Sequence, residues 1–526
     1  MIYRSPFPDV DIPVMPLTAF VFRNVAQHAD KPAMIDGPSG RTYTYAQLLG
    51  AAQRLAAGLA LRGFKKGDVF GVYLPNLPEY AIVFHGVGLA GGILTTVNPL
   101  YTAHELGMQM RDSGAKYLLT IPLFLDNAKK AAAESGVEEI FVLGEGEGAT
   151  PFMALLQNNA PVPQVDIDPK NDLVVLPYSS GTTGLPKGVM LTHYNLVANL
   201  AQLEALKSDS IELEPNDTML GLLPFYHIYG MVCIMNYGLN LGATVVTMPR
   251  FDLEPFLQII QNYKVTWANL VPPLVLALGK HPLVDKYDLS SLRAILSGAA
   301  PLGKEAQEAA QTRLHCTATQ GYGLTETSPV THLDIRLPGQ DKPGSIGTLI
   351  PNTEAQIVDL ASGESLGPDT QGELWIRGPQ VMKGYHNNPE ATARTIDRDG
   401  WLHTGDVAVA DADGYFWILD RIKELIKYKG MQVAPAELEG VLLSHPAIAE
   451  GAVIPIPDEE AGEIPKAFVV LKGNVTPAEI LDYVAARVAP HMKIRSIEIV
   501  SEIPKSPTGK LLRRVLVERE RARRAI

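Results

Sequence analysis

At 526 residues and 57.0 kDa, the chain is longer than one hydrophobic core usually organises, so we expect at least two domains. Hydrophobic residues make up 46% and charged residues 19% of the sequence, which is a globular composition without disordered or fibrous bias. The formal net charge of -12 argues against a general nucleic-acid binder, because neutralising phosphates requires a basic surface.

Cysteine usage and the N-terminal residues bear on the compartment. Cys233 and Cys316 stand far apart and in no metal-binding spacing, so the sequence predicts neither a disulfide scaffold nor a zinc site. Asp9, Asp11 and several prolines interrupt the region where a secretory signal has an unbroken apolar stretch. The apolar stretch 81–97 is short for a bilayer span and indicates a buried helix running into a strand. We therefore expect a cytoplasmic protein without integral membrane association.

The first half of the chain alternates between two kinds of pattern. From Thr44 onward, apolar residues recur at helical spacing, and short β-branched runs such as 69–74 and 116–121 separate these segments. Such alternation is typical of an α/β fold with largely parallel sheets.

A GxGxxG pattern at Gly86, Gly88 and Gly91 resembles a dinucleotide-binding fingerprint. Residues 79–85 before it have a helical pattern, whereas that fingerprint must follow a strand and open a helix. We interpret these glycines as sites of close helix packing.

The second half changes in character at two points. After about Gly344, strand patterns and glycine turns predominate, and Asp413–Gly414 has the composition of a hairpin turn. Beyond Arg421, helix and strand patterns alternate over about a hundred residues. We expect a large N-terminal domain of α/β sheets, 1–421, with a β-rich subdomain at about 344–421, and a small mobile α+β C-terminal domain, 422–526.

The tail from Lys510 is rich in basic residues. Seven Lys and Arg residues stand there against Glu518 and Glu520. Such a charge run indicates a solvated terminal helix.

The loop SSGTTGLPKG, Ser179–Gly188, indicates a phosphate-binding site. It follows an apolar run at 173–176 and precedes a segment that becomes helical after Thr192. Glycines let backbone N–H groups approach an anion, hydroxyls add donors, and a lysine adds charge. Pro186 stands where a Walker A loop requires glycine, so kinase and GTPase functions lose support. The loop residues predicted to bind a polyphosphate are Ser179, Ser180, Gly181, Thr182, Thr183, Gly184 and Lys187.

These residues and several later motifs resemble the adenylate-forming superfamily of acyl-CoA synthetases, luciferases and nonribosomal adenylation domains. The resemblance covers nearly the whole chain and is strongest to 4-coumarate–CoA ligases and their bacterial relatives. In family order, the later motifs are GYGLTE (321–326), GELWIRGPQVMKGY (372–385), GWLHTGD (400–406), DRIKELIKYKG (420–430) and PKSPTGK (504–510).

The resemblance implies roles in an adenylation step, where catalysis depends on positioning and charge neutralisation. Thr325 would touch the α-phosphate, Glu326 would ligate Mg²⁺, and Lys510 would bridge the attacking carboxylate and the α-phosphate. The ATP-binding residues implied besides the loop are Gln320, Gly321, Tyr322, Gly323, Thr325, Asp406, Arg421 and Lys510. Among these, Asp406 and Arg421 would bind the ribose, and the segment 320–322 would pack on adenine.

The resemblance also implies a second step, in which a thiol attacks the acyl carbon after rotation of the C-terminal domain about Lys423. Rotation would withdraw Lys510 and present Lys427 and Gln432 as catalytic residues. Lys429 and Gly430 would contact CoA.

The expected acid pocket is lined mostly by small or apolar residues, which suits a flat aromatic or an aliphatic acid. Its residues are His227, Tyr229, Gly230, Met231, Leu296, Ala299, Ala300, Gly323, Pro329 and Val330. Plant 4-coumarate ligases often carry a lysine where this chain has Leu296, which weakens a hydroxycinnamate preference.

We therefore expect an ATP-dependent acid–CoA ligase with ATP, Mg²⁺ and CoA as cofactors, and we favour an aryl or phenylpropanoid acid such as 4-coumarate. Medium- or long-chain fatty acids, loading of a carrier protein, and luciferase-like oxygenation stay open as alternatives. Retention of Lys187, Glu326 and Lys510 argues against a non-catalytic adenylate sensor. A weak homodimer also stays open, and no nucleic-acid partner is expected.

Overall fold

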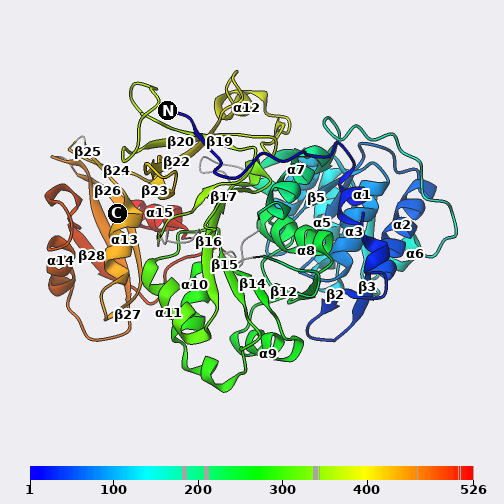
Figure 1. Ribbon diagram of the computed structural model, residues 1–526, viewed down its shortest axis with the longest axis horizontal. Coiled ribbons are helices and arrows are strands. Elements are labelled where there is room, and N and C mark those ends of the chain that lie inside the picture. Colours follow the sequence, from blue (N-terminus) through cyan, green and yellow to red (C-terminus); the bar gives the residue numbers. More distant parts are fainter. Residues whose placement is uncertain are drawn as a thin grey trace.

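Two mixed sheets flanked by helices make up most of the N-terminal part of the molecule, and a small α+β unit stands at the opposite end (Figure 1). The computed structural model describes residues 1–179, 186–206, 212–335, 342, 344–429, 431–458, 460–506, 509 and 511–524. The arrangement is a mixed α/β fold with a large N-terminal and a smaller C-terminal domain, so the predicted fold class is confirmed.

The first sheet has parallel strands at its centre and an antiparallel hairpin at one edge. Its order is β10 (Tyr178–Ser179), β11 (Lys187–Thr192), β9 (Leu173–Val175), β5 (Ile93–Thr96), β4 (Val69–Val72), β6 (Ala115–Thr120), β7 (Glu139–Val142) and β8 (Thr150–Pro151), with β21 (Gly384–Tyr385) paired to β11. The helices of this part are α2 (Tyr45–Leu61), α3 (Glu79–Leu89), α4 (Ala103–Ser113), α5 (Leu125–Ser135), α6 (Met153–Leu156) and α7 (His193–Glu204).

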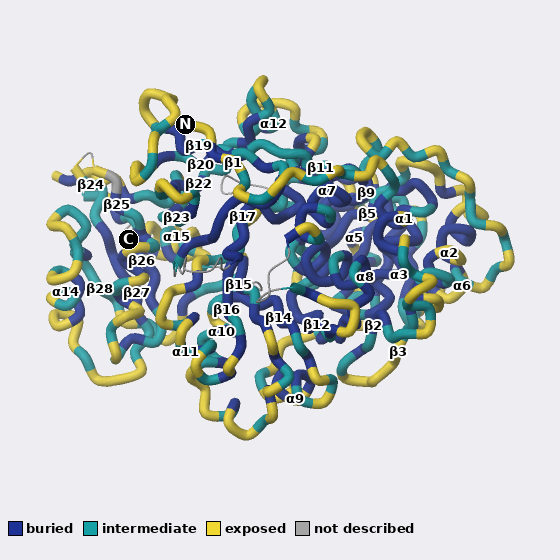
Figure 2. Tube along the Cα trace, in the orientation of Figure 1, coloured by how far each residue is buried: buried dark blue, intermediate teal, exposed yellow. Residues whose placement is uncertain are grey.

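The second sheet is parallel through its centre and antiparallel at both edges. Its order is β18 (Thr348–Leu349), β17 (Val330–Leu333), β16 (Thr317–Gly323), β15 (Ala294–Ser297), β14 (Trp267–Leu270), β12 (Thr218–Gly221), β13 (Thr244–Thr247), β2 (Pro32–Asp36) and β3 (Thr42–Thr44). The helices nearby are α1 (Leu17–Val21), α8 (Tyr237–Leu241), α9 (Leu253–Tyr263), α10 (Pro272–Lys280) and α11 (Lys304–Leu314). Buried positions concentrate on the strands and helices of these two sheets, while exposed residues lie mainly on the peripheral loops (Figure 2).

A third sheet is antiparallel and contains the predicted hairpin turn. Its order is β1 (Tyr3–Arg4), β19 (Glu354–Val358), β20 (Gly372–Arg377), β22 (Leu402–Ala410) and β23 (Phe416–Arg421), and α12 (Pro389–Thr395) precedes β22. Gly414 adopts a φ of 81° between β22 and β23, and Asp411 accepts hydrogen bonds from the amides of Asp413 and Tyr415. The β-rich character predicted after Gly344 is therefore observed.

The chain beyond Arg421 builds a fourth sheet with cores of its own. Its order is β25 (Met431–Val433), β24 (Ile426–Tyr428), β27 (Gly462–Leu471) and β26 (Ile448–Asp458), with β28 (Ser496–Ile499) paired to β27. The helices are α13 (Pro435–Leu443), α14 (Pro477–Ala485) and α15 (Arg513–Arg524). Two buried apolar clusters consist entirely of residues between 426 and 517, so this part carries its own hydrophobic interior.

The terminal helix α15 is less solvated than its charge run predicts. Its Leu516 is 1% exposed, and Glu520 forms an ion pair with Lys466 of β27 at 2.7 Å. The side chain of Arg513 is 13% exposed. One face of the helix is therefore buried against the sheet, because its apolar and paired acidic residues are spaced at helical intervals.

The prediction of close helix packing at Gly86 is confirmed by local structure. The glycines of the GxGxxG pattern lie in and after α3, where a Cβ on Gly86 would be 2.6 Å from the Leu55 side chain of α2. They allow close helix packing and form no nucleotide loop. Among the residues that the structure describes, no helix combines the length and the apolar character needed to cross a bilayer.

Candidate active site

Two paired antiparallel strands flank the predicted phosphate-binding loop. Ser179 of β10 pairs with Lys187 of β11, and the next pair is Tyr178 with Gly188. Loop residues Ser180, Gly181, Thr182, Thr183 and Gly184 lie outside the described residues. On the other side of β11, Val189 pairs with Tyr385 of β21. The two ends of the loop are therefore fixed by pairing to neighbouring strands.

Glu326, the predicted Mg²⁺ ligand, lies next to both ends of this hairpin. Its Oε1 accepts hydrogen bonds from the Ser179 hydroxyl at 3.1 Å and from the Tyr385 hydroxyl at 2.8 Å. The Nζ atom of Lys187 lies 4.7 Å from the centroid of the Tyr385 ring. Burial, together with the Glu326 charge, raises the pKa of Tyr385, so this phenol stays protonated and donates. A carboxylate, an ammonium group and a hydroxyl thus lie close together where the loop joins its two flanking strands.

Tyr385, the last residue of the motif GELWIRGPQVMKGY, has a position in the site that its sequence context does not predict. The structure places its ring beside Lys187 and its hydroxyl on Glu326. The pairing of β21 with β11 produces this juxtaposition, and nothing in the local sequence indicates such pairing.

Asp406, in the middle of β22, forms a second cluster with residues near the ends of β16 and β23. The buried carboxylate of Asp406 accepts a hydrogen bond from the Tyr322 hydroxyl at 2.6 Å and lies 3.1 Å from Nε of Arg421. Burial, with Asp406 as the next cause, raises the pKa of Tyr322. A carboxylate offers about four lone-pair directions, so acceptor capacity remains for two ribose hydroxyls.

The remaining predicted ATP-binding residues lie on or just after β16. The amide oxygen of Gln320 accepts a hydrogen bond from the Leu302 amide at 3.0 Å, while its buried Nε2 has no partner within the described ranges. Gly321 and Gly323 belong to the same strand, and Thr325 opens the short helical turn that contains Glu326. A Cβ on Gly323 would lie 2.0 Å from the Pro329 carbonyl oxygen, so this position requires glycine.

These residues fit a Mg²⁺-bound nucleotide triphosphate. Oε2 of Glu326 has no hydrogen-bond partner in the described parts of the chain, and a single carboxylate plus phosphate oxygens is a common set of Mg²⁺ ligands. Lys187 supplies a cation, and the orphaned amide of Gln320 supplies a donor. Mg²⁺ bound there would neutralise phosphate charge as a Lewis acid.

Three residues of the predicted acid pocket, Tyr229, Gly230 and Met231, lie in a π-helix, Tyr229–Asn236. The Tyr229 hydroxyl donates to the Leu296 carbonyl of β15 at 2.9 Å and accepts from Asn269 of β14 at 3.4 Å. Gly298 lets the Tyr229 ring lie close to the backbone, because a Cβ there would be 2.7 Å from that ring. The Tyr229 side chain is therefore held in one position and forms a fixed wall of the predicted pocket.

Other predicted pocket residues surround this wall. His227 accepts a hydrogen bond through Nδ1 from the Tyr229 amide at 3.3 Å. Ala299 adopts a φ of 69° directly after Gly298, and Ala300 follows it. Pro329 carries a cis peptide bond, and Val330 begins β17. A Cβ on Gly321 would lie 4.0 Å from the Leu296 side chain, which places Leu296 beside β16.

The residues predicted for CoA and the thiol step stand elsewhere. Lys427 of β24 pairs with Gln432 of β25, and this hairpin lies at the outer edge of the C-terminal part, away from β16 and β17 (Figure 1). Lys427 is exposed, and Lys429 forms an exposed ion pair with Glu460 at 2.5 Å. The structure therefore does not bring this set together with Glu326. Gly430 lies outside the described residues.

The chain around the predicted adenylation lysine approaches the N-terminal domain. Lys510 itself is not among the described residues, but Gly509 is. A Cβ on Gly509 would lie 3.4 Å from Cγ2 of Val271 and 3.5 Å from Cγ of Pro273, at the start of α10. Lys423, the predicted hinge, is exposed. Partial desolvation, followed by the nearby positive charge of Lys187, lowers the pKa of its ammonium group.

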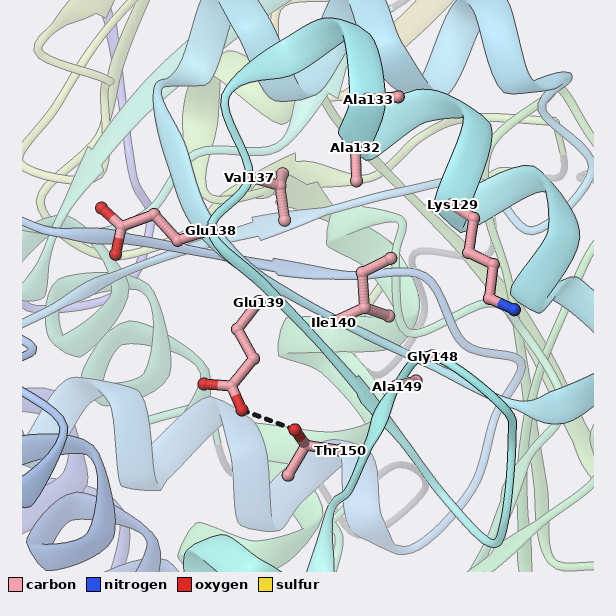
Figure 3. A pocket seen from close by; sticks show the side chains of 10 residues that line it. All are labelled: Lys129, Ala132, Ala133, Val137, Glu138, Glu139, Ile140, Gly148, Ala149 and Thr150. Carbon is pink, nitrogen blue, oxygen red and sulfur yellow. Dashed lines mark hydrogen bonds between the residues drawn. The ribbon is translucent and has the colours of Figure 1, made fainter.

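A separate surface hollow of about 590 Å³ lies between α5 and the strands β7 and β8 (Figure 3). Its wall includes Lys129 and Glu139, and the Glu139 carboxylate already accepts a hydrogen bond from Thr150 at 2.6 Å. None of the predicted site residues lines this hollow.

Most of the chain matches known proteins. The AMP-binding enzyme family matches residues 21–386, and the AMP-binding enzyme C-terminal domain matches residues 437–510. The chain is 44% identical to 4-coumarate–CoA ligase 2 of Nicotiana tabacum, over 98% of this chain and 96% of the relative. ATP-bound MatB from Rhodopseudomonas palustris superposes with a TM-score of 0.88 at 29% identity, covering 96% of this chain and 99% of that chain. The anthranilate CoA ligase AuaEII in complex with anthranoyl-AMP also gives 0.88, at 27% identity, covering 98% and 99%.

The chain belongs to the AMP-binding enzyme family. Within this family it is an AMP-forming acid–thiol ligase, which adenylates a carboxylic acid with ATP and passes the acyl group to CoA, using Mg²⁺. The family and the reaction class predicted from the sequence motifs are therefore confirmed.

Proposed function

We propose that the acid is an aromatic one of the phenylpropanoid type, such as 4-coumarate. The fixed wall formed by Tyr229 carries this proposal. Its ring is held by Leu296 and by the absence of a side chain on Gly298, which suits stacking against a flat substrate. The tobacco relative is named for 4-coumarate, and AuaEII holds an anthranoyl adenylate, so two similar proteins act on aromatic acids.

In the adenylation step, each charged group of the site has a proposed partner. Lys187, with the loop hydroxyls of Thr182 and Thr183, holds the β- and γ-phosphates, and Glu326 holds Mg²⁺. Tyr385 and Ser179 support this role by fixing Oε1 of Glu326.

The other residues bind the nucleoside and the reacting carboxylate. Asp406 and Arg421 bind the ribose, with the segment 320–323 against the adenine and Thr325 at the α-phosphate. Lys510 bridges the attacking carboxylate and the α-phosphate, and the approach of Gly509 to Val271 and Pro273 supports this placement. Catalysis then consists mainly of holding anions together and stabilising the charge on the α-phosphate.

The thiol step requires a different arrangement of the same chain. We propose domains at 1–421 and 422–526, with rotation about Lys423 that withdraws Lys510. Rotation brings the β24–β25 hairpin to the site, so that Lys427 and Gln432 act there and Lys429 and Gly430 contact CoA. The exposed positions of Lys427 and Lys429 support the proposal, because exposed side chains can meet another surface after a domain rotation.

Medium- and long-chain fatty acids are the second candidate class, because no described pocket residue supplies a charge that would reject an alkyl chain. Loading of a carrier protein is a further candidate for the thiol. A cytoplasmic location belongs to the same proposal, because the free thiols of Cys233 and Cys316 fit a reducing compartment.

A panel of acids tests the substrate class. Purified enzyme is supplied with ATP, Mg²⁺ and CoA together with hydroxycinnamates, benzoates or fatty acids of short to long chain, and AMP and thioester are followed. We expect the largest kcat/KM for a phenylpropanoid acid. A larger value for a fatty acid of eight or more carbons would replace this proposal with the fatty-acid candidate.

The division of labour between the two steps has its own test. Lys510→Ala is expected to abolish acid-dependent ATP–pyrophosphate exchange while still converting a supplied acyl-adenylate to thioester. Equal loss of both half-reactions would contradict the assignment of Lys510 to adenylation alone.

A further inference from the structure

Asp420, at the end of β23, contacts the C-terminal part of the chain in two ways. Its Oδ2 accepts a hydrogen bond from the backbone amide of Ala436 at 2.7 Å, in the first turn of α13. Its Oδ1 lies 3.6 Å from Nη1 of Arg513 and also accepts the amide of Arg421 at 2.7 Å. The Asp420 side chain is 2% exposed. It is therefore a desolvated carboxylate whose charge is stabilised by a helix N-terminus and a guanidinium.

Arg513 binds two further carboxylates. Its Nε and Nη2 donate to the two oxygens of Glu439 at 2.9 and 2.6 Å, in a bidentate pair, and its Nη1 donates to Glu424. Glu439 lies in α13, and Arg513 opens α15, three residues after Lys510. These bonds join α13, α15 and the segment after the hinge into one unit.

The position of Lys423 divides this cluster. Asp420 precedes the hinge, whereas Glu424, Ala436, Glu439 and Arg513 all follow it. The pairs that Arg513 forms with Glu424 and Glu439 therefore move as a unit when the C-terminal domain rotates. The contacts of Asp420 with Ala436 and Arg513 cross the hinge and depend on the orientation of the two domains.

The same orientation places Gly509 against α10. Arg513 lies four residues beyond Gly509 and begins the helix that follows it. A contact that holds Arg513 thus also limits where the segment 504–510 can lie. If the domain rotated, Arg513 would keep Glu439 and Glu424, whereas the buried Asp420 carboxylate would lose its guanidinium partner and the Ala436 amide, which disfavours rotation.

We propose that Asp420 is a positioning residue that latches the C-terminal domain in the adenylation orientation, through the Ala436 amide and Arg513. This latch holds Lys510 at the site during the first step and opens for the second. The inference rests on the rotation about Lys423 proposed above. Asp420 touches no substrate in this arrangement, because its carboxylate faces α13 and Arg513.

Measuring adenylation and thioester formation separately in the Asp420→Asn variant tests the latch directly. Asparagine keeps the size of the side chain and removes its charge. We expect the kcat for acid-dependent ATP–pyrophosphate exchange to fall at least tenfold, with the KM for ATP within twofold of wild type. Thioester formation from a supplied acyl-adenylate should be equal or faster, because the opened domain favours that step.

Arg523→Lys is the matched control. Arg523 lies on α15, the helix that Arg513 begins, and pairs with Glu498 at 2.7 Å, entirely within the C-terminal part. Both half-reactions of this variant should match the wild type. Equal loss of both half-reactions in Asp420→Asn would overturn the latch, since it would indicate a general structural role. A raised KM for ATP with unchanged kcat would also overturn it, since Asp420 would then act through its neighbour Arg421.

A distance measurement tests the latch without any turnover. Fluorescent labels are attached to cysteines introduced at Glu308 of α11 and at Lys472 after β27, both of which are exposed. The native Cys233 and Cys316 are buried and should not compete for the label. With ATP and Mg²⁺ present, the distance distribution of Asp420→Asn should shift relative to wild type and Arg523→Lys.

An unchanged distribution in Asp420→Asn would overturn the latch. If the wild-type enzyme converted none of the acids to an adenylate or thioester, the proposed substrate class and step assignments would fail on that assay alone. The label distances would still decide whether Asp420 holds the two domains together.

Discussion

The two sets of residues proposed to act in this ligase differ in how they are held. In the N-terminal domain, Glu326 lies in the short turn after β16 and Asp406 lies within β22, and each accepts a hydrogen bond from a nearby tyrosine hydroxyl. Lys427 and Lys429 stand on an exposed hairpin of the C-terminal domain, and Lys429 has an exposed carboxylate as its partner. The first set is already assembled, whereas the second set is not at the site.

This difference follows from the chemistry that each set serves. Adenylation brings several anions together, so its groups are most effective when their orientation is fixed before the substrates bind. The thiol step comes after pyrophosphate has left, so its groups can be supplied later by movement of a domain. The comparison predicts unequal consequences for substitutions in the two regions.

The largest effect is expected at Glu326. Glu326→Gln removes the charge proposed to hold Mg²⁺, and we expect kcat/KM for adenylation to fall by about 10²–10³-fold. The Mg²⁺ concentration for half-maximal rate should rise. Tyr385→Phe, which removes one hydrogen bond to the same carboxylate, should cost about tenfold or less. A smaller loss in Glu326→Gln than in Tyr385→Phe would contradict the assignment of Glu326 to the metal.

A second strong effect is expected at Gly323, where the fixed region leaves no room for a methyl group. Gly323→Ala would place Cβ 2.0 Å from the Pro329 carbonyl oxygen, so the end of β16 must shift. We expect adenylation to fall by about 10²-fold, because small displacements of positioned groups have effects of this size. Gly440→Ala in α13 is the control, since a Cβ there meets nothing within 4 Å. Its adenylation rate should match the wild type, and equal losses in the two variants would contradict the argument.

Lys427→Ala tests the residue set on the β24–β25 hairpin and should have a smaller, selective effect. We expect thioester formation from a supplied acyl-adenylate to fall by about tenfold, the loss expected for one charged contact. ATP–pyrophosphate exchange should stay within twofold, because Lys427 lies away from the first site. A parallel loss of pyrophosphate exchange would show that the two sets do not act in separate steps.

The smallest effect concerns the stability of the N-terminal domain in acid. Burial lowers the pKa of His85 to about 3, of His193 to about 4 and of His332 to about 3. Because these values lie below the unfolded value of 6.5, the stabilisation from the neutral side chains is complete above that pH and decreases as the pH falls below it. Between pH 6.5 and its folded-state pKa, each buried histidine should lower the free energy of unfolding by about 1.4 kcal/mol for every pH unit of acidification.

Thermal unfolding at pH 7.5 and 5.5 checks this expectation. His85→Gln should reduce the loss of stability between these two values by about 1 kcal/mol relative to wild type. His104→Gln, on the exposed surface of α4, should leave the loss unchanged. An equal pH dependence in all three proteins would show that burial of His85 does not set its protonation.

Local signals predicted much of the fold. Thr192 caps α7 through a reciprocal pair of hydrogen bonds with Asn195, three residues later, and the sequence placed the helix start there. The helical pattern before Gly86 correctly separated close packing from nucleotide binding. Such signals are readable because they depend on residues within one or two turns of each other.

Side-chain partners across the fold could not be predicted in this way. Ser179 meets Glu326 across 147 residues, and Tyr322 meets Asp406 across 84. The motifs brought Glu326 and Asp406 into consideration only through family resemblance. The burial of Arg513 was missed, because a run of charges does not show which of its members faces acidic residues on another element.

The π-helix at Tyr229–Asn236 has a consequence for how acid preference can change over time. Its i→i+5 bonding accommodates one more residue in a turn than an α-helix does. Deleting one residue there would let the turn relax to ordinary α-helical bonding, because a π-type turn takes up one extra residue while the flanking segments keep their phase. Tyr229, Gly230 and Met231, which lie in this segment, would be redirected, while Glu326 and Asp406, on other elements, would keep their positions. Loss of a single codon is therefore a short route to a changed wall of the predicted acid pocket, away from the residues predicted to bind ATP and Mg²⁺.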